Sequence, residues 1–171
     1  VRTALRAGNE PAAAAALVAY YRARPAPSWL GPQLTAHAPD ADNDATTSLA
    51  LAEAALGDTF TFQGVTGRAP RLPQGGLDWT HRGPRDDMEW ALFFNRHFLL
   101  LPLLRAHQST QDPRFAAYAN ATLSDWVQTR PVENLAHERE MSAAWRPMSS
   151  ASRLLQAWPH AFFGFRNAPG F

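Results

Sequence analysis

The stretch from Asp86 to His107 constrains the fold more than any other part of the sequence. Its apolar residues recur at helical spacing, yet they cover nearly the whole circumference of a helix. They are Met88, Trp90, Leu92, Phe93, Phe94, Phe98, Leu99, Leu101 and Leu104. A helix that is apolar on every side must be surrounded by other elements. The sequence therefore predicts a buried helix from Asp86 to about His107, with a kink at Pro102.

Four further helices are predicted from start and stop signals. Each has a capping residue or proline at its start, or a proline or glycine at its end. Their expected ranges are Ala12–Arg24 behind Asn9-Glu10-Pro11, Asp44–Leu56 before Gly57, a helix from Asp112-Pro113 that ends before Pro131, and Pro147 to about Phe163. Along the last of these, Met148, Ala151, Leu155, Trp158 and Phe162 form an apolar stripe at spacings of three and four, which we expect to face the core.

One segment interrupts the helical pattern. Thr59–Phe62 alternates like a short strand, and glycines and prolines punctuate the chain from there to Trp79. We expect an irregular loop of about 25 residues, a length at which loops are usually functional or mobile. The predicted class is all-α with one irregular loop excursion. The pattern alone leaves a bundle, a solenoid and a toroid of helix pairs open.

Composition excludes several classes of protein. A net charge of +1 argues against a strongly basic nucleic-acid protein, and the absence of cysteine excludes disulfides and thiolate chemistry. The most apolar run, Leu99 to Leu104, is too short for a membrane span. No signal peptide is visible behind Val1, so we expect any leader to have been removed. We expect no metal site and no cofactor, because the six histidines do not form the pairs that zinc enzymes use. They are His37, His81, His97, His107, His137 and His160.

The candidate binding residues are arginines and one tryptophan. All 16 basic residues are arginine, which fits a GC-rich genome and also suits bidentate binding of carboxylate or sulfate. Arg146 and Arg153 are seven residues apart, opposite the predicted apolar stripe, and Trp145 precedes them. We interpret them either as a solvated polar face or as an arginine-lined groove for an acidic polymer, with Trp145 stacking on a sugar ring.

Arg96 lies seven residues after Glu89 on the predicted buried helix. The two side chains share a helix face, so Arg96 forms either a structural ion pair or an anion contact in a cleft. His97 is either a core histidine or a group that titrates near neutral pH.

Three segments together resemble the heparinase II/III superfamily, and within it the heparinase III-like polysaccharide lyases. "VRTALRAGNEPAAAAALVAYYRAR" resembles the first helical hairpin of that family. "DDMEWALFFNRHFLLLPLLRAHQSTQDPRFAAYANATLSDWVQTRP" and "AWRPMSSASRLLQAWPHAFFGF" resemble two later helical segments, in the same order. The Asn95-Arg96-His97 triplet is also common in alginate and glucuronan lyase relatives.

The resemblance implies that residues 1–171 form the N-terminal part of an incomplete (α/α) toroid of antiparallel helix pairs. The rest of the toroid and a β-sandwich domain are then expected beyond residue 171. It implies β-elimination on a uronic-acid polysaccharide, heparan sulfate-like or related, in the periplasm or outside a bacterial cell. The family's neutralising Asn and its Tyr and His lie beyond the equivalent of Phe171, so no catalytic residue is assigned. The expected substrate-binding residues are Arg96, Trp145, Arg146 and Arg153. The expected partners are the acidic polysaccharide and the remainder of the same polypeptide, with no nucleic acid and no membrane.

Two other functions remain open from the sequence. One is a non-catalytic, lyase-like protein that binds carbohydrate or assists exopolysaccharide assembly. The other is a glycosidase on a similar toroid, which needs two carboxylates across a cleft. Glu89 is a candidate for one of them, and the sequence offers no obvious partner.

Overall fold

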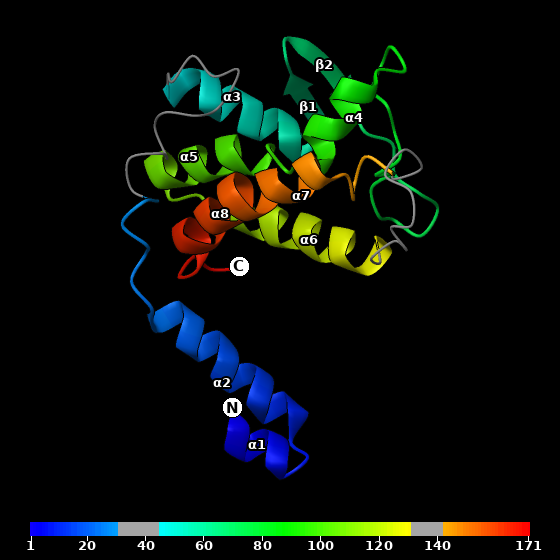
Figure 1. The fold of residues 1–171 in the computed structure, drawn as a ribbon. Helices are drawn as coiled ribbons and strands as arrows, with labels where there is room; N and C mark the ends of the chain where they lie inside the picture. The colour runs from blue at the N-terminus through cyan, green and yellow to red at the C-terminus, as the bar shows by residue number, and fades with distance from the viewer. Residues whose placement is uncertain (31–44, 131–141) are drawn as a thin grey trace.

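The computed structural model describes residues 1–30, 45–130 and 142–171. This part of the chain is mostly helical and carries one two-stranded sheet (Figure 1). Its elements are α1 (Arg2–Arg6), α2 (Glu10–Ala23), α3 (Ala45–Leu56), β1 (Thr59–Phe62), β2 (Val65–Arg68), α4 (Met88–Asn95), α5 (Leu100–Thr110), α6 (Pro113–Thr129), α7 (Pro147–Ser152), the π-helical turn η3 (Arg153–Ala157) and α8 (Trp158–Phe165). The helical class predicted from the sequence is confirmed.

Helix α5 is the centre of the helical body. It packs against α3, α6 and α8, and its leucines Leu100, Leu103 and Leu104 are almost fully buried. The aromatic residues of α4 join the same core, where the Phe94 ring stacks on Trp79 at 4.4 Å between centroids. The burial predicted for the stretch from Asp86 to His107 is therefore confirmed.

The continuity predicted for that stretch is wrong. It forms two helices, α4 and α5, separated by a turn at residues 96–99 in which His97 has a φ of 61°. A non-glycine residue in this left-handed region ends a helix. Pro102 causes no kink, because it lies in the first turn of α5, where its missing N–H has no partner to lose.

The run predicted as one helix from Pro147 to Phe163 is helical throughout, but it contains the π-helical turn η3. Pro159 follows that turn and cannot donate to the carbonyl four residues earlier, a situation that local π geometry accommodates. The most deeply buried residues of this run recur at intervals of four: Ser149, Arg153, Ala157, Ala161 and Phe165.

The face predicted for this helix is wrong at its first half. Met148 and Leu155 of the expected apolar stripe are 65% and 62% exposed, whereas Arg153, expected on the opposite face, is 1% exposed. Trp158 of the same stripe is partly buried against the core, so the stripe divides between core and surface.

The segment from Thr59 to Trp79 is tied to the helices. The strand predicted at Thr59–Phe62 is present and pairs in antiparallel fashion with β2. Asp125 of α6 accepts hydrogen bonds from the Leu77 amide at 3.0 Å and from Trp79 Nε1 at 2.8 Å. Gly76 lies so close to Asp125 that a Cβ there would collide with the carboxylate. Polar contacts therefore hold this loop in place.

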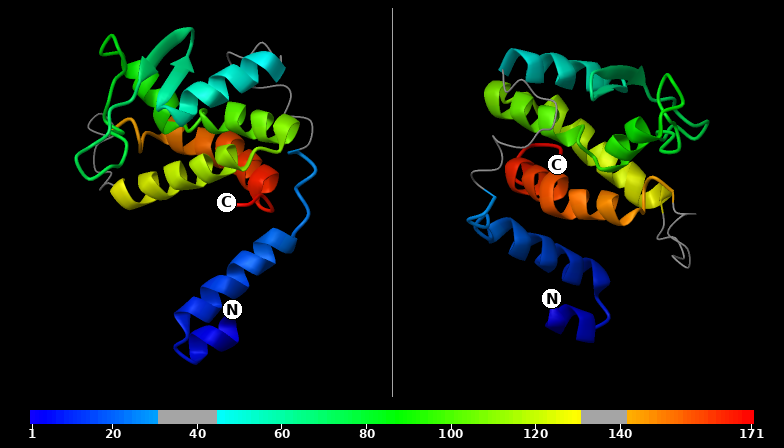
Figure 2. Two further views of the ribbon diagram at one scale, coloured as in Figure 1. Left: turned by 180° about the vertical axis from the view of Figure 1, so that it is seen from behind. Right: turned by 45° about the horizontal axis from the view of Figure 1, so that its top comes forward.

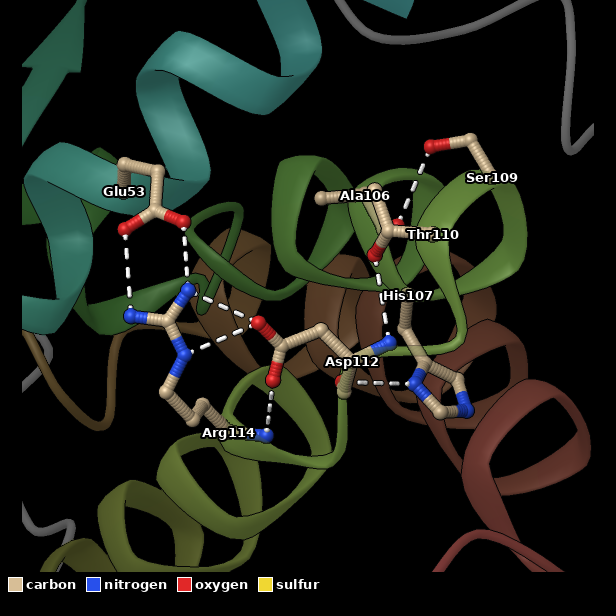
Figure 3. A network of polar contacts seen from close by, with 7 residues as sticks. All are labelled: Glu53, Ala106, His107, Ser109, Thr110, Asp112 and Arg114. Carbon is tan, nitrogen blue, oxygen red and sulfur yellow. Dashed lines mark hydrogen bonds and ion pairs between the residues drawn. The ribbon is translucent and has the colours of Figure 1, made fainter.

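A second polar network fixes the corner between α5 and α6 (Figure 3). The Asp112 side chain caps α6 by accepting from the Arg114 amide at 2.9 Å, as the sequence predicts for a helix that begins at Asp112-Pro113. Arg114 also pairs with Glu53 of α3 at 2.8 Å, and His107 Nδ1 lies 3.0 Å from the Asp112 carbonyl. The network joins three helices at one corner.

The α1–α2 hairpin stands apart from this body in all three views (Figures 1 and 2). Helix α2 begins as predicted, with the Asn9 side chain accepting from the Ala12 amide at 3.0 Å. No helix among the described residues is long and apolar enough to cross a membrane.

Candidate functional site

The best-organised polar centre lies where the end of α4, helix α6 and the α7–η3 junction meet. Asn95, the last residue of α4, is fully buried. Its side-chain amide donates to the carbonyls of Trp79 at 3.0 Å and Ala91 at 2.9 Å, and its Oδ1 accepts from Trp126 Nε1 at 3.3 Å. Every polar group of this side chain is therefore used in holding the loop and α6 against α4.

His97 is a core histidine in this structure. It is 1% exposed, and its Nδ1 accepts a hydrogen bond from Trp158 Nε1 at 2.8 Å. Because Nδ1 is the acceptor, the neutral ring carries its proton on Nε2. Burial lowers the pKa of His97 well below its usual value of 6.5, and the nearby charge of Arg153 lowers it further. The imidazole therefore stays neutral at physiological pH.

Arg153 is a buried cation enclosed by aromatic rings. Its guanidinium carbon lies 4.5 Å from the ring centre of Trp126, 5.4 Å from Trp145 and 5.7 Å from Trp158, three residues that we call the tryptophan cluster. Such contacts over aromatic faces stabilise a cation that has lost its water. Burial lowers the pKa of Arg153 to about 10, so the side chain remains charged at neutral pH.

The hydrogen bonds of Arg153 go to neutral oxygens. Nη1 donates to the Asn95 carbonyl at 2.6 Å, and Nη2 donates to Ser150 Oγ at 3.2 Å. None of the ion pairs found among residues 1–30, 45–130 and 142–171 involves Arg153. The guanidinium thus holds the end of α4 by a hydrogen bond to its last carbonyl, just before the turn that carries Arg96 and His97.

The other predicted binding residues occupy different surroundings. Trp145 is partly buried, with its ring 5.2 Å from Trp126, so it belongs to the cluster that encloses Arg153. Arg146 is partly exposed at the start of α7. The structure therefore joins Trp145 and Arg153 and leaves Arg146 beside them at the surface.

Arg96 is also partly exposed, and its guanidinium lies 5.0 Å from the ring centre of Phe93. Within the described part of the chain, no ion pair joins Arg96 to Glu89, so the predicted structural pair is not formed as a direct contact. Burial lowers the pKa of Arg96, an effect that the charge of Glu89 opposes.

An apolar cavity of ≈ 200 Å³ lies between α3, the β-hairpin and the α4–α5 turn. Phe60, Phe93 and Phe98 contribute to its walls, and Arg105 lines it as well. Burial lowers the pKa of Arg105. The cavity suits an apolar group, and it holds none of the residues predicted to bind substrate.

Neither His97 nor Tyr118 is poised as a base that could remove a proton from a sugar. His97 is buried and neutral, and the Tyr118 hydroxyl donates to Asp58 at 2.9 Å in surroundings that raise its pKa, mainly through burial. Clusters of residues that could hold a metal ion are absent from this part of the chain too, while His37 and His137 lie outside the described residues. What the geometry provides is a rigid arrangement of arginine and tryptophan side chains.

Sequence reasoning missed three members of this centre: Asn95 as a buried hydrogen-bonding hub, and Trp126 and Trp158 as partners of Arg153. Trp158 was expected only as a core residue of its helix, and Trp126 was given no role. The sequence did contain a signal for this centre, because several tryptophans lie near the ends of two predicted helices and near a single arginine. A buried arginine needs aromatic or anionic neighbours.

Comparison with known proteins identifies the class to which this fold belongs. The sequence model of the family described as "Heparinase II/III N-terminus" matches residues 1–171, and the chain belongs to that family. The resemblance read from the three sequence segments is therefore confirmed. No curated protein sequence matches the chain.

Two solved structures illustrate the likeness. The heparan sulfate lyase HepC from Pedobacter heparinus is 25% identical, with a TM-score of 0.74, over 99% of this chain and 26% of that chain. The BT4657 gene product, a heparinase III, shares the fold at 21% identity with a TM-score of 0.72, over 99% of this chain and 27% of that chain. The chain thus spans about a quarter of the length of the solved chains that it matches.

Proposed function

We propose that this chain is the N-terminal helical part of a longer polysaccharide lyase that cleaves a uronic-acid polysaccharide, heparan sulfate-like or related, by β-elimination. The observation that carries the proposal is the match of the family over residues 1–171, together with the likeness to HepC over 99% of the chain. A non-catalytic lyase-like carbohydrate-binding protein is less well supported, because the solved relative HepC is described as a heparan sulfate lyase.

The proposed architecture is an (α/α) toroid whose first helix pairs lie within residues 1–171. Further helices and a β-sandwich domain then follow in the same polypeptide. The antiparallel pairing of α5 with α6 agrees with this arrangement. Periplasmic or secreted localisation is part of the proposal, since an enzyme of this kind meets its polymer outside the cytoplasm.

In the proposed reaction a base removes the proton from C5 of a uronate. The electron pair forms the C4–C5 double bond, and the C4–O bond breaks, with a proton delivered to the leaving oxygen. Charge on the C5 carboxylate has to be neutralised for the proton to be lost. We propose that the neutralising group and the base lie in the remainder of the polypeptide.

The role proposed for this chain is binding and positioning. We propose that Arg146 and Arg96, both partly exposed, bind acidic groups of the polymer through their guanidinium forks. Arg153 and Trp145, which were expected to contact the sugar directly, are buried or partly buried, so we propose that they fix the start of α7 and the α4–α5 turn from which Arg146 and Arg96 project. Direct contact by Arg153 would require the tryptophan cluster to open.

The test uses the complete gene product with heparan sulfate, hyaluronan, alginate and glucuronan as separate substrates. Formation of an unsaturated uronate, followed by its ultraviolet absorbance, is expected on at least one of them. Arg146→Ala should raise KM on that substrate about 10-fold or more, since a charge-assisted hydrogen bond contributes about 1.5–3 kcal/mol. An active enzyme whose KM is unchanged in Arg146→Ala would remove Arg146 from the site.

A further inference from the structure

Helix α2 carries all of its large apolar side chains on one face. At 100° per residue, the four side chains fall within an arc of about 160°. We call them the α2 face: Leu17, Val18, Tyr20 and Tyr21, which are between 44% and 55% exposed. The opposite side of the helix holds Ala15, Ala19 and Arg22. A helix with this distribution is built to be covered along one side.

Little of the described chain covers that face. The short helix α1 packs on α2, and the one buried residue of α2 is Ala13. The hairpin stands away from the body in every view (Figures 1 and 2). A helix of 14 residues gains too little from its own hydrogen bonds to be stable in water without packing. The α2 face therefore needs a partner.

The last described residues lie beside the C-terminal end of α2. Arg22 Nη2 donates to the Phe171 carbonyl at 2.9 Å, and Arg166 donates to the Arg24 carbonyl. Phe171 packs its ring on Phe165 of α8 at 5.3 Å, which fixes this end against the helical body. Figure 1 shows the C-terminus between that body and the hairpin.

We propose that the α2 face is the docking surface for the segment of the polypeptide that continues from Phe171, and that this segment is an amphipathic helix. The inference rests on the proposal that the chain is part of a longer polypeptide, and it does not depend on lyase activity. The solved relatives are long enough to supply such a segment, because this chain covers only 26% and 27% of them. A segment that continues from Phe171 begins beside the C-terminal turn of α2, on the side of Arg22, and has only to pass round that turn to reach the α2 face.

The chemistry of the face favours a helix of the same chain over a soluble ligand. It offers aliphatic side chains and two tyrosine rings with no acidic group, and Arg24 lies 5.5 Å from the Tyr20 ring centre. Apolar faces of this size on one helix are matched by the apolar stripe of a neighbouring helix.

The direct experiment places the photo-crosslinking residue p-benzoylphenylalanine at position 21 of the complete gene product. The matched control carries it at position 19, which is exposed at the centre of the opposite side of α2. We expect cross-links within one molecule from position 21 to residues beyond 171, and at least 10-fold fewer from position 19. Cross-links between two copies or to another protein, equal yields from both positions, or no cross-link at all would overturn the proposal.

A second measurement is independent of the crosslinker. In the complete protein, Leu17→Asp should speed hydrogen exchange at least 10-fold both in α2 and in one segment beyond residue 171. Ala19→Asp lowers helix propensity without removing packing, so it should change exchange in α2 by no more than about threefold and leave the segment beyond residue 171 unchanged. Faster exchange confined to α2 would contradict docking. Unsaturated-uronate formation by the unmodified protein is measured alongside. If the protein is an active lyase but shows no cross-link, the docking proposal fails while the proposed function stands.

Discussion

Removal of the Arg153 side chain should destabilise the fold rather than directly remove a substrate contact. Arg153→Ala leaves the buried Asn95 carbonyl without the donor at 2.6 Å, a loss of about 1–3 kcal/mol. It also strips a cation from three tryptophan faces and leaves a cavity at a site that is 1% exposed. Relief of the cation's desolvation offsets part of this loss. We expect a net decrease in the free energy of unfolding of about 3 kcal/mol.

Two further variants separate the contributions. Arg153→Met keeps most of the volume but removes the hydrogen bonds and the charge, so it should cost about 1–2 kcal/mol. The matched control is Arg146→Ala, seven residues earlier and partly exposed, which should change stability by no more than about 0.5 kcal/mol. The same control should weaken substrate binding about 10-fold or more, as a lost charge-assisted contact requires.

The assay is urea denaturation of the complete gene product followed by tryptophan fluorescence, with substrate affinity measured per folded molecule. Arg153→Ala is expected to lower stability, while the folded fraction, whose Arg96 and Arg146 are less firmly positioned, loses less than about tenfold in substrate affinity, a difference below ~1.4 kcal/mol. If Arg153→Ala kept its stability within about 1 kcal/mol and lost tenfold or more in affinity, the scaffold role argued from burial would be refuted. Arg153 would then be a direct substrate contact.

Three other perturbations have defined outcomes. Because the folded protein holds His97 neutral while the unfolded chain protonates it below pH 6.5, the free energy of unfolding should fall as pH falls below that value, by up to about 1.4 kcal/mol per pH unit. Urea denaturation at several pH values should show a shallower fall in His97→Asn, and identical slopes would argue against a buried neutral ring. Gly76→Ala should lower the melting temperature through collision with Asp125, whereas Gly75→Ala, with open space but a φ of 94°, should cost less; a loss in Gly76→Ala no larger than that in Gly75→Ala would show that the Asp125 carboxylate moves aside at little cost. The isolated 171-residue chain should bind a hydrophobic dye and show no turnover of heparan sulfate, hyaluronan, alginate or glucuronan; dose-dependent turnover would place a base within residues 1–171.

Much of the fold could be predicted because its signals are local. The Asn9 cap, the Asp112-Pro113 start and the alternation of Thr59–Phe62 each report on a few neighbouring residues, and all three are present in the structure. The burial of α4 and α5 followed from apolar residues on every side. Their separation into two helices could not be read from periodicity, because the turn depends on a left-handed His97 that tertiary contacts hold in place.

The candidate site was harder to predict for a related reason. A π-helical turn changes the angular spacing of side chains, so a stripe drawn at 3.6 residues per turn assigned Met148 and Leu155 to the core and Arg153 to solvent. An arginine at a core position also contradicts the hydrophobic pattern. The tryptophan cluster that stabilises it is assembled from α6, the segment just before α7, and α8, and no local sequence pattern predicts such an assembly.

The measurement that tests the central claim most directly is the end-group chemistry of polysaccharide treated with the complete gene product. Each cleavage by β-elimination leaves one unsaturated uronate at the new non-reducing end, so ultraviolet absorbance and new reducing ends should rise in equal molar amounts on a uronic-acid polymer. New reducing ends without unsaturation would indicate hydrolysis and a glycosidase. Saturable binding of the polymer with neither product would identify a non-catalytic carbohydrate-binding protein and contradict the proposed lyase.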